Sequence, residues 1–219
     1  MIRVAVWGTG NVGRAAIRMV DGHPELELAA VVVSSDAKVG QDAGDLAQLG
    51  RTTGVVATKD LPNVDAVVYA ASADFRPDEA LADILQALRS GAAVVTPGIY
   101  ALYDPPSAPR ALVEPVEAAC KEGGSAFFAN GIDPGWGNDL LPLLASGFVS
   151  EWSQLRAQEI FDYSGYPVAF AIYDVFGFGR PLDHTPILAL PGVQGTTWGP
   201  PVRMVADACL LYTSDAADE

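Results

Sequence analysis

The first twenty residues, MIRVAVWGTGNVGRAAIRMV (1–20), decide the fold that this sequence predicts. Residues 2–7 form a short apolar run with β-branched side chains, which is typical of a buried strand. The spacing G-x-G-x-x-G follows at once, at Gly8, Gly10 and Gly13. Residues 11–20 then change to helical periodicity. A glycine turn of this spacing between a strand and a helix is typical of dinucleotide-binding folds.

Each glycine of this turn has a separate expected role. Gly8 would permit the tight turn, Gly10 would let a pyrophosphate approach the backbone, and Gly13 would let the helix pack closely on the strand. Free N–H groups and the dipole of the helix would then hold the anion. The alternative is a glycine-rich turn that binds nothing, which the flanking strand and helix disfavour.

The composition predicts a globular protein. The chain has 219 residues, of which 50% are hydrophobic and 18% charged, and its formal net charge is -14. This acidity argues against nucleic-acid binding through phosphates. No apolar run reaches the roughly 18 residues of a membrane helix, and the N-terminus lacks signal-peptide features. The two cysteines, Cys120 and Cys209, have no metal-ligand spacing, so we expect no metal site and a reduced, cytoplasmic setting.

Strands and helices are predicted to alternate along most of the chain. Further strands are expected at 26–33, 54–57, 64–71, 92–96 and 125–129, and helices at 42–49, 77–90, 108–122 and 140–148. This order predicts an α/β fold, a doubly wound parallel sheet of the Rossmann type with helices on both faces.

The residue pattern and composition of the sequence change near Glu151. Residues 152–161 are predicted to form a longer strand, an aromatic-rich region follows, and a helix is expected from about 203. We therefore predict a Rossmann domain that binds NAD(P) over 1–150 and the beginning of an α+β domain, for substrate or dimerisation, over 151–208. Residues 209–219 resemble the translation of a sequencing adapter, which predicts a truncated chain with a non-native tail. A natural polar tail is the alternative.

The tip of the second predicted strand bears on the choice of cofactor. An acid there would bind the ribose 2′-hydroxyl of NAD, and a base would accommodate the 2′-phosphate of NADP. Ser34, Ser35 and Lys38 favour NADP, whereas Asp36 keeps NAD as the alternative. The two serines can equally cap the next turn without touching a cofactor.

The glycine turn and the later stretch NGIDPGWGNDLLP (130–142) together resemble one family. They are similar to the dihydrodipicolinate reductase-like NAD(P)-dependent oxidoreductases, in the branch of the 2,4-diaminopentanoate dehydrogenases and native amine dehydrogenases. The resemblance covers residues 1 to about 208. It implies an N-terminal NAD(P)-binding domain, a C-terminal α+β domain and, typically, a homodimer. It also implies hydride transfer to or from a C=N or C–N carbon of a small amine, ketone or imine.

The resemblance further implies which residues meet the cofactor. Those that would line the pyrophosphate are Gly8, Gly10, Asn11, Val12 and Gly13. Those that would meet the adenosine ribose are Ser34, Ser35 and Lys38. Those around the nicotinamide would be Ala70, Ala71, Thr96 and Gly98, with Asn138 reaching its carboxamide.

Two departures from the family patterns concern catalysis. Dihydrodipicolinate reductases carry a His-His pair and a nearby Lys in the second domain, and the comparable stretch EIFDYSGY (159–166) has neither. Amine dehydrogenases typically carry a glutamate just after the strand that corresponds to 92–96, and Ile99 and Tyr100 stand there instead.

Tyr100 and Glu159 are the catalytic candidates. Tyr100 would polarise or protonate the substrate, although a phenol with a pKa near 10 is a poor base at neutral pH; the alternative is an aromatic ring that only packs. Glu159 would face the site from the second domain, or else be an ordinary exposed acid. Asp133 precedes a proline and is predicted to form a turn.

The sequence thus predicts an NAD(P)-dependent oxidoreductase of the amine dehydrogenase or imine reductase type. Two alternatives stay open. One is a 4-hydroxy-tetrahydrodipicolinate reductase of lysine biosynthesis. The other is a dinucleotide-binding sensor without catalytic turnover.

Overall fold

The computed structural model describes residues 1–73, 76–166 and 168–209. By its contacts the chain divides into two compact units. Unit 1 consists of residues 1–99 and 109–130, and unit 2 of residues 100–108 together with the chain from Gly131 onward. The predicted domain boundary after residue 150 stays a prediction. Residues 210–219 of the predicted tail lie outside the described residues.

Unit 1 is built on a parallel sheet, whose strands in the described residues are β1 (Ile2–Trp7), β2 (Leu26–Val32), β3 (Ala57–Thr58), β4 (Ala66–Tyr69), β5 (Ala93–Thr96) and β6 (Phe127–Ala129). Their order across the sheet is β3-β2-β1-β4-β5-β6. This is the order of the doubly wound dinucleotide-binding fold, in which the direction of winding reverses between β1 and β4. The predicted Rossmann fold is confirmed.

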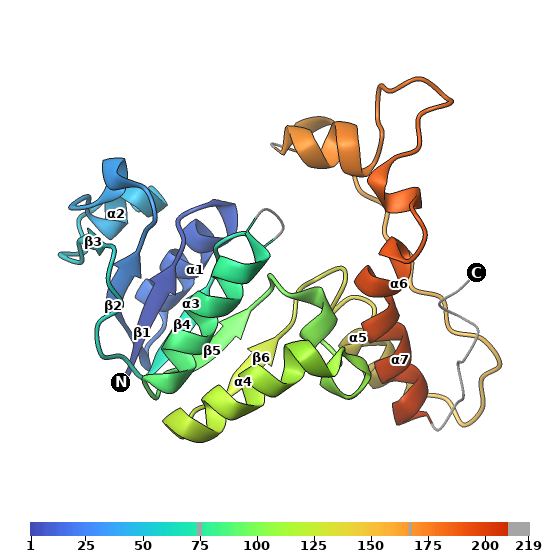
Figure 1. Ribbon diagram of the computed structural model, residues 1–219, viewed down its shortest axis with the longest axis horizontal. Coiled ribbons are helices and arrows are strands. Elements are labelled where there is room, and N and C mark those ends of the chain that lie inside the picture. The colour runs from blue at the N-terminus through green and yellow to red at the C-terminus, as the bar shows by residue number, and fades with distance from the viewer. Residues whose placement is uncertain (74–75, 167, 210–219) are drawn as a thin grey trace. The chain divides into compact units, whose positions relative to one another are not determined.

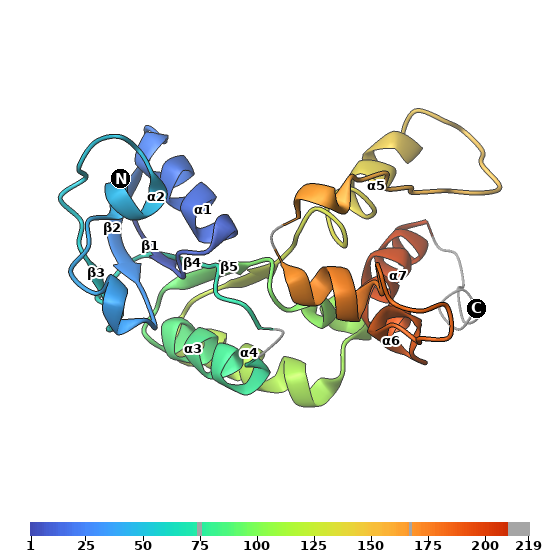
Figure 2. The same cartoon turned by 90° about the horizontal axis from the view of Figure 1, so that it is seen from above.

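Helices cover both faces of this sheet. Those of unit 1 are α1 (Asn11–Gly22), α2 (Ala43–Ala47), α3 (Pro77–Arg89) and α4 (Arg110–Gly123). Figure 2 shows α1 on one face and α3 and α4 together on the other. The first turn of α3 contains Pro77, which is favoured at a helix start, and then Asp78 and Glu79, whose negative charges interact favourably with the helix dipole.

The core lies between the sheet and these helices. The central strands bury nearly continuous apolar runs, as expected for strands covered on both faces. On one side Ile17 and Val20 of α1 are fully buried, and on the other Ile84 and Leu88 of α3 are. This packing holds the carboxyl ends of the strands, and the loops that follow them, in fixed positions.

Tyr69 carries a polar group into this core. Its side chain is 1% exposed, and its hydroxyl donates to Asp83 Oδ2 at 2.9 Å; the same oxygen accepts from Arg76 Nη2 at 2.7 Å. Burial first, and then the Asp83 carboxylate, raise the pKa of Tyr69 well above its usual range. The hydroxyl therefore stays protonated and acts as a donor.

Replacing Tyr69→Phe is expected to lower the free energy of unfolding by about 1–2 kcal/mol, because the Asp83 carboxylate loses a donor while Arg76 remains. Urea denaturation followed by circular dichroism measures this change. Tyr173→Phe alters a half-exposed tyrosine and should shift the value by less than about 0.5 kcal/mol. Equal unfolding curves for Tyr69→Phe and the unsubstituted chain would contradict the expectation.

Asp42 fastens the loop between α2 and β3. Its carboxylate accepts from the backbone N–H groups of Thr53 (2.9 Å), Gly44 (2.7 Å) and Gly54 (2.9 Å). These bonds, that from Thr53 foremost, lower the pKa of Asp42. The stabilisation is thus fully present above the pKa of the unfolded carboxyl and is lost as the pH falls through the lowered folded value.

Asp42→Asn is expected to lower the midpoint of urea unfolding at neutral pH and to weaken its dependence on pH in the acid range. Asp45→Asn, which removes an exposed carboxylate from α2, is the matched control and should keep the dependence. Denaturation curves at a series of pH values below 5 measure both. A pH dependence that is unaltered by Asp42→Asn would count against the assigned hydrogen bonds.

Unit 2 is helical within the described residues (Figure 1). Its α-helices there are α5 (Leu140–Ser146), α6 (Val193–Thr197) and α7 (Gly199–Ala208), joined by short turns that include η2 (Tyr100–Leu102) and η4 (Tyr163–Gly165). The strand predicted over 152–161 was wrong: this segment has no regular structure. A strand needs a neighbour to bond its N–H and C=O groups, and none of the described strands pairs with it.

Candidate functional site

Close backbone approaches shape the turn between β1 and α1. Gly8 has φ +102°, and a Cβ built there would lie 2.7 Å from the backbone nitrogen of Ala71. A Cβ on Gly13 would lie 2.0 Å from the carbonyl oxygen of Gly8. Neither position has room for a side chain, so the first turn of α1 rests directly on the end of β1.

Gly10 is different, because a Cβ there would meet nothing within 4 Å. Gly10 is the N-cap of the 12-residue helix α1, and no side chain caps this end of the helix. Asn11 and Val12 follow as the first, exposed helical residues. Backbone N–H groups and the helix dipole make such an end attractive to anions. The space over Gly10 is therefore suited to a pyrophosphate.

The other cofactor residues predicted in unit 1 follow neighbouring strands of the sheet. They are Ser34, Ser35 and Lys38 after β2, Ala70 and Ala71 after β4, Thr96 at the end of β5, and Gly98 after it. In a parallel sheet all these strand ends share one edge. The structure places them along the same edge as the glycine turn, at the reversal point where ligands bind in such folds.

The part of this edge formed by the ends of β4 and β5 is closely packed. Thr96 is fully buried, and its Oγ1 accepts from the backbone N–H of Gly98 at 3.0 Å. A Cβ on Gly98 would lie 3.3 Å from that oxygen and 3.6 Å from the carbonyl oxygen of Ala71. The structure thus brings Ala71, Thr96 and Gly98 together, with backbone rather than large side chains at their surface.

Lys38 reaches the glycine turn itself. Its ammonium donates to Thr9 Oγ1 at 2.9 Å, and Thr9 is buried. Asp36, two residues earlier, pairs with Lys59. Sequence reasoning missed Thr9, which occupies a variable position of the glycine spacing. Its hydroxyl holds the Lys38 ammonium against the glycine turn.

The predicted site residues Tyr100, Asn138 and Glu159 belong to unit 2. Tyr100 begins η2 and meets Tyr103 edge-on, with ring centroids 6.0 Å apart. Asn138 lies in a tight loop, residues 131–139, where its Oδ1 accepts from the backbone N–H of Gly135 at 2.8 Å and its Nδ2 donates to Asp133 Oδ1.

Asp133 joins three segments of unit 2. Its Oδ1 also accepts from Trp198 Nε1 at 2.8 Å, and its carboxyl lies near that of Glu159. Glu159 in turn accepts from the hydroxyl of Tyr163 at 3.1 Å. The Asp133 carboxyl, and secondarily burial, raise the pKa of Glu159, because a neighbouring carboxyl disfavours the ionised form of Glu159. Burial, with Glu159 as the next cause, raises the pKa of Tyr163 to about 12.

Sequence reasoning assigned Asp133 only to turn formation. Its position before a proline, in the stretch that carries the resemblance, was the available signal. Its partner Trp198 lies 65 residues away, and no local pattern could have indicated that contact.

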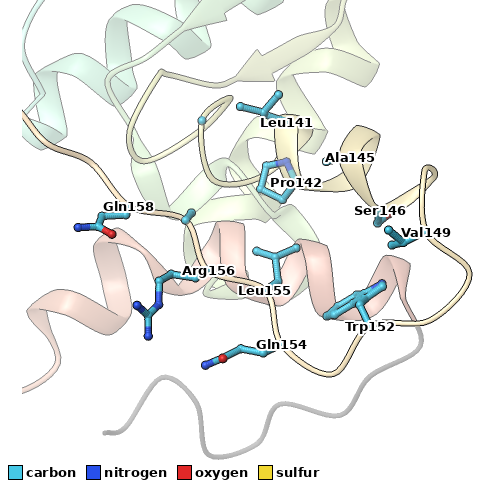
Figure 3. Close-up of a pocket in the computed structure, with 12 residues that line it drawn as sticks. Leu141, Pro142, Ala145, Ser146, Val149, Trp152, Gln154, Leu155, Arg156 and Gln158 are labelled. Atoms are coloured by element: carbon cyan, nitrogen blue, oxygen red, sulfur yellow. The ribbon is translucent and has the colours of Figure 1, made fainter.

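Unit 2 also contains a pocket of about 410 Å³ between α5 and the extended segment 152–158 (Figure 3). Leu155 points from that segment toward Pro142 of α5. None of the predicted site residues lines this pocket. Among the residues that the structure describes, no cluster of three or more His, Cys, Asp or Glu is arranged to hold a metal. None of the described helices is long and apolar enough to cross a membrane.

Comparison with known proteins gives three findings. Residues 2–97 match the family model described as "Dihydrodipicolinate reductase, N-terminus". The chain is 53% identical over 213 residues to an amine dehydrogenase from Streptomyces virginiae, an alignment that covers 95% of this chain and 59% of that protein. It is 38% identical over 101 residues to a 4-hydroxy-tetrahydrodipicolinate reductase from Paraburkholderia phymatum, covering 43% of this chain and 36% of that protein.

Among solved structures, the chain resembles an amine dehydrogenase from Mycobacterium smegmatis. The TM-score is 0.56 at 25% identity, over 68% of this chain and 45% of that one. The chain therefore spans less than two thirds of the length of the relatives it matches. The predicted resemblance to the dihydrodipicolinate reductase-like oxidoreductases, in their amine dehydrogenase branch, is confirmed.

Proposed function

We propose, from this resemblance, that the chain contains the cofactor-binding part of an NAD(P)-dependent amine dehydrogenase. One observation of the structure supports the proposed dinucleotide cofactor. The start of α1 at Gly10 has no side-chain cap and is open to an anion, at the reversal point of a Rossmann sheet. The proposal that the substrate is an amine rests on the 53% identity to an amine dehydrogenase. In that reaction an amine is oxidised to an imine, which water converts to a ketone and ammonia.

The nicotinamide would supply the hydride chemistry, and the chain would bind and orient it. The N–H groups at Asn11 and Val12 would hold the pyrophosphate. Ala71, Thr96 and Gly98 would present a flat, mostly backbone surface to the nicotinamide, and Asn138 would bond its carboxamide. Tyr100 and Glu159 remain the proposed catalytic groups, Tyr100 as a proton donor and Glu159 as a carboxyl group for the amine.

We further propose NADP as the preferred cofactor. The loop after β2 carries Lys38 and the acid Asp36, and Asp36 is paired with Lys59, which follows β3. Lys38, held by Thr9, would be the cation for the 2′-phosphate, with Ser34 and Ser35 as hydroxyl donors. NAD use is the alternative.

Lys38→Ala is expected to weaken NADP⁺ binding about tenfold while changing NAD⁺ binding less than about twofold, because a single charge-assisted contact is worth roughly 1.4 kcal/mol. Titration calorimetry with both cofactors measures this. Lys121→Ala, an exposed lysine near the end of α4, is the charge-matched control. Equal losses for the two cofactors would oppose the NADP assignment.

The proposed activity is tested on the chain with its natural continuation. Purified protein should bind NADPH, and it should oxidise NADPH in the presence of ammonia and a ketone, or reduce NADP⁺ with an amine. Absence of any dinucleotide binding would refute the proposal. Tight binding without turnover over a broad panel of amines, ketones and imines would favour the sensor alternative instead. Complementation of a lysine-pathway deletion would favour the dipicolinate reductase alternative, which is supported here by a match over 43% of the chain.

We also propose a homodimer and a cytoplasmic location. The homodimer rests on the family resemblance alone. The reduced setting is in keeping with the free thiol of Cys120.

A further inference from the structure

The glycine turn and the loop after β2 are joined by hydrogen bonds within unit 1. The backbone N–H of Gly8 donates to the carbonyl oxygen of Val32, at the end of β2, at 2.8 Å. The loop then passes through the short turn η1 (Asp36–Lys38), and the N–H of Gly40 donates to the carbonyl oxygen of Ala57 in β3 at 2.8 Å. The sheet therefore fixes the position of this loop relative to the glycine turn.

The Lys38 ammonium bridges these two segments. It donates to Thr9 Oγ1 at 2.9 Å; Lys38 is half-buried, and Thr9 is only 8% exposed. The hydroxyl is neutral, so this bond orients the ammonium without compensating its charge. Within the described part of the chain no carboxylate forms an ion pair with Lys38, because the nearby Asp36 pairs with Lys59 instead.

This uncompensated cation is suited to an anion. An ammonium has three N–H donors, of which Thr9 takes one. The hydroxyls of Ser34 and Ser35 are exposed on the same loop and can donate to phosphate oxygens together with Lys38. The tip of the second strand is where a dinucleotide-binding fold meets the adenosine ribose. A phosphate on that ribose therefore fits the charge of this loop.

Thr9 gives the lysine a rigid anchor. It follows Gly8, whose backbone has no room to move, because a Cβ there would lie 2.7 Å from the backbone nitrogen of Ala71. A lysine side chain loses much rotamer freedom when it is immobilised by a ligand. A lysine that a fixed hydroxyl already orients loses less of that freedom on binding, which raises affinity.

We infer that Thr9 is a positioning residue, which holds the Lys38 ammonium in place for the 2′-phosphate of NADP and so contributes to discrimination against NAD. The inference rests on the proposed function, because that function supplies the dinucleotide and its 2′-phosphate. It assigns Thr9 no contact with the cofactor. Its effect should therefore be confined to ligands that carry the 2′-phosphate, and it should require Lys38.

Titration calorimetry on the full chain, with NADP⁺ and NAD⁺, tests the inference. Thr9→Val keeps the shape of the side chain but removes the acceptor. It should weaken NADP⁺ binding about fivefold and leave NAD⁺ within about twofold. Thr9→Ser keeps the hydroxyl and should leave both affinities within about twofold of the unsubstituted chain. The double variant Thr9→Val/Lys38→Ala should match Lys38→Ala alone, because Thr9 acts through Lys38.

Thr52→Val is the matched control, since Thr52 is an exposed threonine of unit 1, and it should change neither affinity. An unchanged ratio of the two affinities in Thr9→Val would overturn the inference. Equal losses for both cofactors would also overturn it and would mark Thr9 as generally structural. So would a further loss of selectivity when Thr9→Val is added to Lys38→Ala.

The same titrations separate this inference from the proposed function. If the unsubstituted chain bound neither cofactor, the proposed function would fail, and this inference with it. Binding of NAD⁺ without NADP⁺ would keep the dinucleotide site but refute both the NADP preference and the role of Thr9. Binding of both cofactors, with a ratio that Thr9→Val does not alter, would overturn this inference alone.

Discussion

Gly13→Ala is expected to lower the free energy of unfolding by about 3 kcal/mol. The added Cβ would lie 2.0 Å from the carbonyl oxygen of Gly8 and 2.7 Å from its carbonyl carbon. These are backbone atoms at the end of β1, so no side chain can turn away to relieve the clash. Either α1 or the strand end must move, and with it the core that both share.

Urea denaturation of Gly13→Ala gives the measurement. Gly22→Ala is the control, because Gly22 lies in the same helix and a Cβ there would meet nothing within 4 Å. That substitution should be neutral or stabilising by up to about 1 kcal/mol, since alanine favours helix. Equal stability of Gly13→Ala and Gly22→Ala would show that the close approach is not present in solution.

Gly10→Ala is expected to separate binding from folding. A Cβ at Gly10 meets no protein atom within 4 Å, so the free energy of unfolding should stay within about 0.5 kcal/mol. The same methyl group would occupy the space proposed for the pyrophosphate. Affinity for NADP⁺ should therefore fall about 10- to 100-fold, which corresponds to roughly 1.4–2.7 kcal/mol.

Calorimetric titration and a denaturation curve on the same sample decide this second prediction. The comparison with Gly13→Ala is informative because both lie in the glycine spacing. Gly13→Ala should lower the free energy of unfolding, and Gly10→Ala should lower only the affinity for the dinucleotide. Unchanged affinity in Gly10→Ala would place the phosphates elsewhere and would weaken the proposed function.

The fold of unit 1 was predictable because its strands are covered on both faces. Such strands are near-continuous apolar runs, as at Leu26–Val32, and they stand out without an alignment. The short strand β3 was less well placed. It was expected at 54–57, whereas Ala57–Thr58 pair with Val31 and Val32 of β2. Its position is set by that pairing rather than by its own sequence.

Unit 2 was less predictable for a related reason. Residues 152–161 have the composition of a strand, but composition does not reveal whether a pairing neighbour exists. The candidate cofactor residues of unit 1 could be proposed from sequence because they follow strands whose ends share an edge. Asp133 could not be ranked above a simple turn residue, because its contacts with Trp198 and Glu159 arise from tertiary structure.

The division into units has a practical consequence for cutting the protein into pieces. Residues 100–108 are an insertion between β5 and α4 that belongs with unit 2, where η2 packs against α6 and α7. Leu102 and Tyr103 within it are buried. A fragment ending at residue 130 would expose these side chains, because their packing partners would be missing, and it should aggregate. A soluble minimal nucleotide-binding fragment would instead need this insertion replaced by a short polar linker.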